Sequence, residues 1–245
     1  GHIFDDLEEA TVEAWVKWDE WGYFSQWFAF GTDADAVEAG GRWRAMGSNH
    51  YDRAHTLQFF IYGPDEDAPH VLATEAEWRQ GAWCHLAVVT GREGMRFYCN
   101  GVLVGQNEYA GAMAAIAPGP HNYLGRSHWR DNTYFHGQLD EVRVWSRARS
   151  AAQIRATMQR RLTGGEDGLV GLWNCDAGGA EDATPKKQHG TLYGGARCET
   201  AAFPGASGPP RPAAVWGTVR DRTGQPLPLA TVRLRDRKGR LVVMR

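Results

Sequence analysis

Short segments of alternating apolar and polar residues, each ended by a turn, constrain the fold of this chain more than any other feature. The clearest case is segment 83–104, where Asn100-Gly101 joins two such segments. Asn-Gly predicts a two-residue hairpin turn because both residues tolerate positive φ. Further segments of strand character are 11–18, 27–30, 56–62, 122–125 and 138–145. Many short strands with almost no helix predict an all-β fold, an antiparallel β-sandwich or barrel.

Segment 11–18 also predicts which side chains face the core. Its two faces carry Val12, Ala14, Val16 and Trp18 on one side, and Thr11, Glu13, Trp15 and Lys17 on the other. We expect the apolar set in the core, which leaves Trp15 on the face away from it.

One helix interrupts the strands. Ser150 and Gln153 have the spacing of a capping box, in which the two side chains bond free backbone N–H groups. Ile154, Met158 and Leu162 then recur on one helical face. The chain is therefore expected to form one short helix after the strand at 138–145.

Three stretches resemble the laminin-G-like, pentraxin-related jelly-roll family. Segment 12–17 resembles the opening strand of the family, and segments 83–89 and 98–101 resemble its central hairpin. Segment 135–150, FHGQLDEVRVWSRARS, resembles its closing signature and is the specific one of the three. The resemblance covers about residues 1–162 and implies a concanavalin A-like antiparallel jelly roll.

Segment 168–203 resembles the N-terminal part of the same family and contains two expected strands, 168–173 and 190–193. The first strands of the fold are missing before Thr11. We therefore expect a domain at 1–203 in which segment 168–203 supplies the missing strands, as in a circularly permuted sandwich. Only a complete sheet leaves no apolar edge exposed. A truncated second copy of the domain is the alternative.

The remainder of the chain predicts a linker and a second β unit. Segment 204–213 is rich in Pro, Gly and Ser, as linkers are. Segment 214–245 resembles the start of a carboxypeptidase regulatory-like, transthyretin-type β domain, and is too short for an independent core. Such units accompany lectin-like domains in bacterial surface proteins and sensor ectodomains. The resemblance implies an extracellular or periplasmic fragment of a larger protein.

Charge and hydropathy exclude two classes of partner. The formal net charge is −2, so no strong basic field attracts nucleic acid. No segment approaches the roughly 18 apolar residues of a membrane span. We therefore expect neither nucleic-acid binding nor membrane insertion in this segment.

Four cysteines, Cys84, Cys99, Cys175 and Cys198, match no CxxC metal pattern. Their even number permits two disulfides, and buried free thiols are equally allowed. Cys84 and Cys99 are expected as diagonal neighbours on one face of the hairpin, which is poor geometry for a bridge. Cys175 with Cys198 is the favoured pair.

The sequence argues against an enzyme. Related concanavalin-like glucanases place carboxylates on one strand as E-x-D-x-x-E, and no such motif occurs here. Asp140 and Glu141 are adjacent, so on a regular strand they point to opposite faces and do not form a pair. His121, His128 and His136 could line the rim of a site, but ordinary positions on surface loops are the favoured interpretation. We therefore predict no catalytic residues.

Calcium is the one cofactor that the resemblance suggests, since many relatives bind it through loop carboxylates and amides. Pentraxins carry acidic ligands after the Leu124-Gly125 position, where this chain has Arg126. That departure argues against a pentraxin-type site. The candidate loop ligands are Asp33, Asp35 and Asn49, with Asp131-Asn132 as an alternative. Ordinary solvated loop residues are the competing interpretation.

A glycan site needs aromatic rings for the CH faces of sugars and directional partners for their hydroxyl groups. The candidate ligand-binding residues, which strand parity or loop position exposes, are Trp15, Trp43, Tyr51, Trp129 and Tyr134. We hypothesise a non-catalytic extracellular recognition module for a glycan or a protein, with carbohydrate favoured. The alternatives are a structural spacer or protein-interaction domain of a sensor ectodomain and, third, a glycoside hydrolase.

Overall fold

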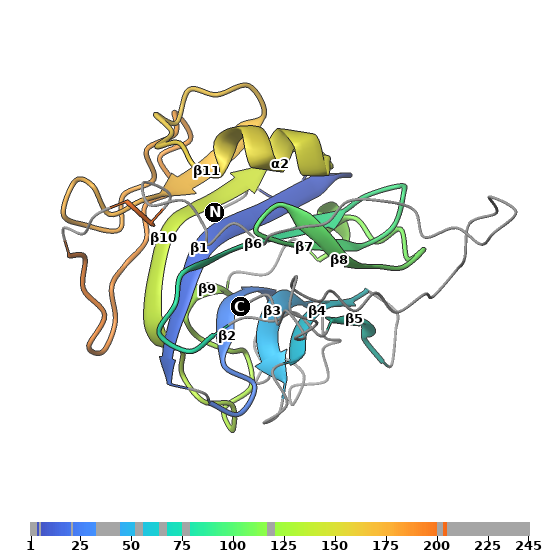
Figure 1. Ribbon diagram of the computed structural model, residues 1–245, viewed down its shortest axis with the longest axis horizontal. Helices are drawn as coiled ribbons and strands as arrows, with labels where there is room; N and C mark the ends of the chain where they lie inside the picture. Colours follow the sequence, from blue (N-terminus) through green and yellow to red (C-terminus); the bar gives the residue numbers. More distant parts are fainter. Residues whose placement is uncertain are drawn as a thin grey trace, which may run out of the picture. The chain divides into compact units, whose positions relative to one another are not determined.

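Figure 1 shows the computed structural model of the chain. It describes residues 4, 6–20, 22–32, 45–51, 56–63, 68–74, 79–116, 121–199 and 203–204. No helix within these ranges is long and apolar enough to cross a membrane.

The strands form two antiparallel sheets, which lie as two layers in Figure 1. The six-stranded sheet has the order β11-β10-β1-β6-β7-β8, from β11 (Leu169–Trp173), β10 (His136–Trp145), β1 (Ala10–Glu20), β6 (Cys84–Thr90), β7 (Arg96–Cys99) and β8 (Val102–Gln106). The five-stranded sheet has the order β5-β4-β3-β2-β9, from β5 (His70–Thr74), β4 (Thr56–Tyr62), β3 (Ala45–Tyr51), β2 (Gln26–Gly31) and β9 (His121–Leu124). The predicted all-β sandwich is confirmed.

One hydrophobic cluster fills the space between the sheets. The alternation of β1 is confirmed, because Val12, Ala14, Val16 and Trp18 all belong to this cluster. The five-stranded sheet contributes Phe28 and Phe30 of β2 and Leu57, Phe59 and Ile61 of β4. Full burial of each such large side chain contributes roughly 1.5–3 kcal/mol relative to leaving it in water. The inner faces of the two sheets therefore hold the sandwich together.

The predicted hairpin turn lies between β7 and β8. Asn100 and Gly101 have φ values of 50° and 73°, as a two-residue turn requires. Asn100 also binds β6, since its N–H donates to His85 O at 2.7 Å and its Oδ1 accepts from His85 N at 2.9 Å. The turn is thereby joined to the neighbouring strand.

The predicted capping box is present at the start of α2 (Ala151–Thr157). Ser150 N donates to Gln153 Oε1 at 2.8 Å, and Gln153 N donates to Ser150 Oγ at 3.3 Å. Ile154, Met158 and Leu162 are buried, as the pattern predicted. The helix ends at Thr157, before the last two of these residues, so the chain is irregular where Leu162 packs.

Helix α2 and the segment after it cover the outer face of the six-stranded sheet (Figure 1). Trp15 lies on that face with 0% of its surface exposed, and its Nε1 donates to Met158 O at 2.8 Å. The rings of His85 and Phe203 contact it edge-on at 5.4 and 6.5 Å. The prediction that Trp15 is available to a ligand is therefore wrong, because strand parity does not show what packs on the outer face.

Four charged side chains are buried together on the same face: Glu13, Glu141, Arg143 and Arg149. Glu13 Oε1 accepts from Arg149 Nη1 at 2.9 Å and from Arg143 Nη1 at 3.3 Å. Arg143 Nη2 also donates to Glu141 Oε2 at 2.6 Å. The two positive and two negative charges cancel, as burial of ions requires. We term these four residues the charge network.

The charge network also holds the end of α2. Arg143 donates to Thr157 O at 3.1 Å and to Arg160 O at 2.6 Å, and Arg149 donates to Gln153 O at 2.7 Å. The last carbonyl groups of a helix lack partners within the helix, and Arg143 satisfies that of Thr157, the last residue of α2. The alternating acidic and basic residues of segment 135–150 therefore attach the helix to the sheet.

Segment 168–199 contributes one strand, β11, to the six-stranded sheet. The strand expected at 190–193 is wrong: residues 190–197 are irregular and exposed. The edge of β11 is instead taken by Asp182, which bridges to Trp173 and accepts from Leu172 N at 3.0 Å. The predicted Cys175–Cys198 disulfide is confirmed.

The domain boundaries stay a prediction, including the permutation in which segment 168–203 supplies missing strands. Apart from Pro204, the expected linker at 204–213 and the expected β unit at 214–245 lie outside the described residues.

Candidate functional site

Small residues occupy the centre of the outer face of the five-stranded sheet. Ala29 pairs with Gly47 on one side and with Tyr123 on the other, and Gly47 pairs with Phe60. Directly paired residues share a face, so these four residues form one row across the sheet. A Cβ atom on Gly47 would lie 2.7 Å from Phe60 Cζ. The Phe60 ring therefore lies against the backbone of Gly47.

Segment 125–132 lies on this sheet and is attached to it through Ser127. The Oγ atom of Ser127 accepts from Gln26 Nε2 at 3.1 Å, from Trp129 N at 3.1 Å and from Asn132 Nδ2 at 2.8 Å. Gly125 N donates to Trp27 O at 3.1 Å. One buried hydroxyl group thus connects the loop to β2 and fixes where Trp129 stands.

Six ring side chains from β4, β9 and this loop form a continuous group, which we term the aromatic cluster: Phe60, Tyr62, His121, Tyr123, His128 and Trp129. The ring centroid of Trp129 lies 5.7 Å from Phe60, 5.9 Å from Tyr62 and 6.3 Å from His128. His128 lies 5.3 Å from Tyr123, which in turn lies 6.0 Å from His121. Edge and tilted contacts at these distances stabilise aromatic pairs.

The aromatic cluster is partly open to solvent. Phe60 and His128 are buried, whereas Tyr62, Tyr123 and Trp129 are half-buried. The exposed guanidinium group of Arg126 lies 4.4 Å from the centroid of the Tyr123 ring. Burial raises the pKa of the Tyr62 hydroxyl, so that group stays protonated and able to donate at neutral pH. Rings with polar tips and a neighbouring cation suit a polar ligand with apolar faces.

Two buried amides lie on the same face of the sheet. Gln26 and Asn49 pair across β2 and β3, and they are 1% and 2% exposed. Gln26 Oε1 and Asn49 Oδ1 have no hydrogen-bond partner among the described residues. Buried polar atoms in native proteins normally have a partner, from the protein or from ordered water. These two amide oxygens on this face of the sheet could therefore each accept a hydrogen bond from water or a ligand.

The structure places two of the predicted site residues on this face and describes a third elsewhere. Trp129 belongs to the aromatic cluster, and Asn49 lies in β3, opposite Gln26. Tyr134 is 71% exposed in a loop where Thr133 N donates to Tyr23 O at 2.9 Å. No ring contact joins Tyr134 to the aromatic cluster in the part of the chain that the structure describes.

The other predicted residues do not join the cluster. Trp15 is buried beneath α2 on the opposite sheet. Tyr51 belongs to β3, but its side chain lies outside what the structure describes, and so do Trp43, Asp33 and Asp35.

Sequence reasoning missed Phe60, Tyr62 and Tyr123. A usable signal existed for the first two, because Leu57, Phe59 and Ile61 were expected on one face of segment 56–62. The same alternation puts Phe60 and Tyr62 on the other face. No comparable signal marks Tyr123, whose position depends on how β9 pairs with β2.

Among the described residues, no group of three or more His, Cys, Asp or Glu side chains could hold a metal ion. Of the predicted calcium ligands, Asn49 is buried in a strand rather than placed on a loop. The alternative pair Asp131-Asn132 does lie on a loop, where Asn132 Nδ2 donates to Ser127 Oγ at 2.8 Å. The calcium site itself stays a prediction, since its two aspartates lie outside the described ranges.

A β-bulge changes the relation between Asp140 and Glu141. In the register of β1 with β10, Glu13 lies opposite Arg143 and Trp15 lies opposite Asp140. Between these two pairs β1 has one residue, whereas β10 has two, Glu141 and Val142. The extra residue is a β-bulge, and Glu141 takes a φ of 51°. Asp140 therefore shares the outer face with Arg143 and Glu141. The prediction that Asp140 and Glu141 point to opposite faces is wrong, because strand parity fails across a bulge.

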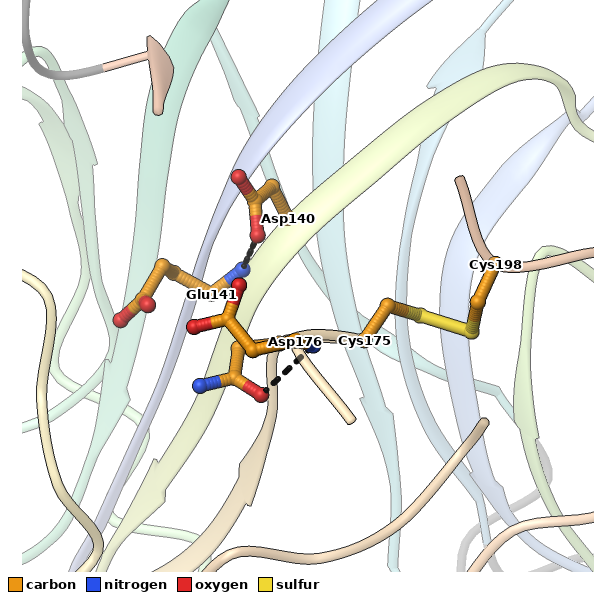
Figure 2. The surroundings of a disulfide bond; sticks show 6 residues. Asp140, Glu141, Cys175, Asp176 and Cys198 are labelled. Atoms are coloured by element: carbon orange, nitrogen blue, oxygen red, sulfur yellow. Dashed lines mark hydrogen bonds between the residues drawn. A yellow bond between two sulfur atoms is a disulfide. The ribbon is translucent and has the colours of Figure 1, made fainter. Parts of the chain in front are cut away.

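These two carboxylates nevertheless have different environments. Figure 2 shows them beside the Cys175–Cys198 disulfide, with Asp140 Oδ1 accepting from Glu141 N at 2.8 Å. Burial, and secondarily the Glu141 charge, raises the pKa of Asp140 to about 6. Glu141 is 0% exposed and is bound to Arg143, so it has no access to a substrate. Asp140 is a half-buried acid at this place, and the charge of the exposed Asp176 nearby also raises its pKa.

A family model described as the concanavalin A-like lectin/glucanases superfamily matches residues 2–155. Among solved structures, a provisionally assigned carbohydrate binding protein from Bacteroides ovatus is similar with a TM-score of 0.52 and 20% identity, over 78% of this chain and 49% of that chain. The CBM40 module of a Ruminococcus gnavus IT-sialidase has a TM-score of 0.52 and 16% identity, over 61% of this chain and 82% of that chain. At these identities the likeness shows the fold alone.

The NanB sialidase of Streptococcus pneumoniae is similar over 60% of this chain and 23% of that chain, with a TM-score of 0.51 and 17% identity. This chain therefore spans about half of the Bacteroides protein and about a quarter of the sialidase. No curated protein matches the chain.

Proposed function

Because the chain belongs to the concanavalin A-like lectin/glucanase superfamily, we propose that it is a non-catalytic extracellular module that binds carbohydrate through its aromatic cluster. One observation carries the proposal. The half-buried rings of Tyr62, Tyr123 and Trp129 gather on one sheet face beside the exposed Arg126. Such rings stack on the CH faces of sugars, while hydroxyl and guanidinium groups bond their oxygens.

Proteins of similar fold support the choice of ligand class. The Ruminococcus gnavus CBM40 module has been solved with α2,3-sialyllactose, at a TM-score of 0.51 and 17% identity. The Bacteroides ovatus protein carries a provisional assignment as a carbohydrate binding protein. These likenesses favour a sugar over a protein as the ligand. Which residues of this chain contact the sugar is our own inference.

The disulfide supports an extracellular or periplasmic location. Cys175 and Cys198 are joined, and disulfides persist in oxidising compartments while they are rare in the cytosol.

The state of the carboxylates supports a non-catalytic role. Glycosidases use two carboxyl groups that flank the scissile bond. Here Glu141 is fully buried and bound to Arg143, so it cannot serve as the second catalytic carboxylate beside Asp140. The superfamily includes glucanases by name, so hydrolysis of polysaccharides is assayed alongside binding.

The test is retention by polysaccharides, measured by affinity electrophoresis and a glycan array with and without calcium. We expect binding by the native chain and a loss of roughly tenfold or more for Trp129→Ala, since losing one stacked ring costs about 1.4 kcal/mol. The matched control is Tyr193→Ala, which removes a ring that is 80% exposed and outside the cluster.

Equal losses for Trp129→Ala and Tyr193→Ala would show that binding does not use the aromatic cluster. Retention by no polysaccharide in either condition would favour a spacer or protein-interaction domain. Release of reducing sugar that disappears in Asp140→Asn would overturn the non-catalytic assignment.

A further inference from the structure

The thiols of Cys84 and Cys99 meet inside the six-stranded sheet. Cys99 pairs directly with Leu86, so Cys84 is its diagonal neighbour on β6, as the sequence predicted. The strand β7 ends at Cys99, and Asn100 turns away with a φ of 50°. As a result the two Sγ atoms lie 3.0 Å apart, about 1 Å more than the length of an S–S bond. The objection that diagonal placement is poor geometry for a bridge does not hold at this strand end.

The surroundings of the pair favour thiol chemistry over metal binding. Both cysteines belong to the hydrophobic cluster between the sheets, and they are 5% and 8% exposed. They join no group of three His, Cys, Asp or Glu side chains among the described residues. Two thiolates alone supply half of a tetrahedral metal site.

The chain already contains one disulfide, Cys175–Cys198. A domain that acquires this bond folds where thiols are oxidised, and two further thiols that touch each other meet the same conditions.

We propose that Cys84 and Cys99 form a second disulfide in the secreted protein. Each thiol loses its proton and the two sulfur atoms together give up two electrons as the S–S bond forms. An oxidised dithiol oxidoreductase or a small disulfide takes up the two electrons and two protons, and is released as two thiols. The bond then joins β6 to the end of β7 across a separation of 15 residues.

Burial determines when this bond forms. The hydrogen bond with Cys99, followed by burial, raises the pKa of Cys84 well above its usual value. The thiolate is the attacking species in thiol–disulfide exchange, so a thiol held protonated in the core reacts very slowly. Oxidation therefore takes place while the hairpin is still open, and the closed sandwich afterwards protects the bond from reductants.

The first experiment counts thiols in the full chain secreted into an oxidising compartment. The protein is unfolded in guanidinium chloride with iodoacetamide, without reductant, and its intact mass is measured. We expect no alkylated cysteine before reduction and four after it. Two alkylated cysteines before reduction would overturn the proposal. Peptide mapping must then show Cys84 linked to Cys99, since a link from either one to Cys175 or Cys198 would overturn it equally.

The second experiment uses variants. Cys175→Ala/Cys198→Ala should still show no free thiol, whereas Cys84→Ala should show one, from Cys99. The folded native protein, treated with a mild reductant, should lose the half-buried Cys175–Cys198 bond first and keep the buried one. Complete reduction of both bonds at the same rate would contradict a bond sealed in the core. The thiol count on the native chain decides the question if a variant fails to fold.

Discussion

The two outer faces of the sandwich are both covered, but by different chemistry. On the six-stranded sheet, α2 lies on the charge network, and the guanidinium groups bond both carboxylates and helix carbonyls. On the five-stranded sheet, segment 125–132 lies on small residues and places half-buried rings at the surface. The first face is closed by ionic pairing and the second is left partly open.

This difference separates the face that holds the scaffold together from the face that we propose binds the ligand. Charges that are 0–5% exposed and paired with each other are out of reach of a ligand in solvent, although Glu13 Oε2 and Glu141 Oε1 have no hydrogen-bond partner among the described residues. Half-buried rings keep part of their surface in contact with solvent, where a ligand can reach it. A sequence signature therefore need not mark a site, because segment 135–150 builds the closed face.

The largest expected effect comes from opening the charge network. Arg143→Ala leaves Glu141 buried without the cation that binds it and removes one of the two cations that bind Glu13, so we expect the free energy of unfolding to fall by about 3–5 kcal/mol. Urea denaturation followed by tryptophan fluorescence measures it. The control is Arg147→Ala, which breaks a solvent-exposed pair with Asp167 and should cost about 0.5 kcal/mol or less. A similar cost for both variants would mean that the network is no more than a set of surface ion pairs.

A smaller effect is expected from crowding the open face. Gly47→Ala places a methyl group 2.7 Å from Phe60 Cζ and 3.0 Å from Phe28 O, so the Phe60 ring must move. We expect a loss of about 1–3 kcal/mol in unfolding free energy and weaker glycan binding through displacement of Trp129. Gly165→Ala is the control, because its nearest neighbouring atom lies 3.9 Å away. Unchanged stability and binding in Gly47→Ala would show that the cluster does not depend on this row.

The smallest effect concerns the half-buried acid at the margin of the closed face. Asp140 has a pKa of about 6 in the folded protein and an ordinary value near 3.8 when unfolded. The folded state therefore binds the proton more tightly, and this group favours folding below about pH 4 and ceases to do so as the pH rises through about 6. Asp140→Asn should stabilise the protein by about 1 kcal/mol at pH 8, after allowance for solvent screening.

At pH 3.5 the same variant should match the native chain, because the native carboxyl is then protonated as well. Urea denaturation at both pH values checks this. Stabilisation of equal size at both would assign the gain to the amide group itself rather than to removal of a charge.

Local patterns in the sequence predicted the fold well. The alternation of segment 11–18, the Asn100-Gly101 turn and the Ser150–Gln153 capping box all describe neighbours along the chain, and all three are confirmed. The bulge at Glu141 was not foreseeable, since a residue with a side chain rarely takes positive φ and only the pairing partners require it here.

The candidate site was predicted in part, for a physical reason. Trp129 was named as a ligand-binding residue and lies in the cluster, whereas Trp15, which strand parity placed outside the core, is buried. Parity shows which residues leave the core, but the packing of distant segments decides which of them reach solvent. Helix α2 and Phe203 cover Trp15 from more than 130 positions away.

The bridge between Trp173 and Asp182 has a consequence for how this domain behaves at high concentration. A strand at the end of a sheet normally presents a row of free N–H and C=O groups to which another chain can add. Here Leu172 N donates to Asp182, Leu172 O accepts from Ala183 N, and Val170 O accepts from Thr184 Oγ1. These positions of β11 offer no template for strand addition, so this edge resists the sheet-to-sheet growth from which β aggregates form.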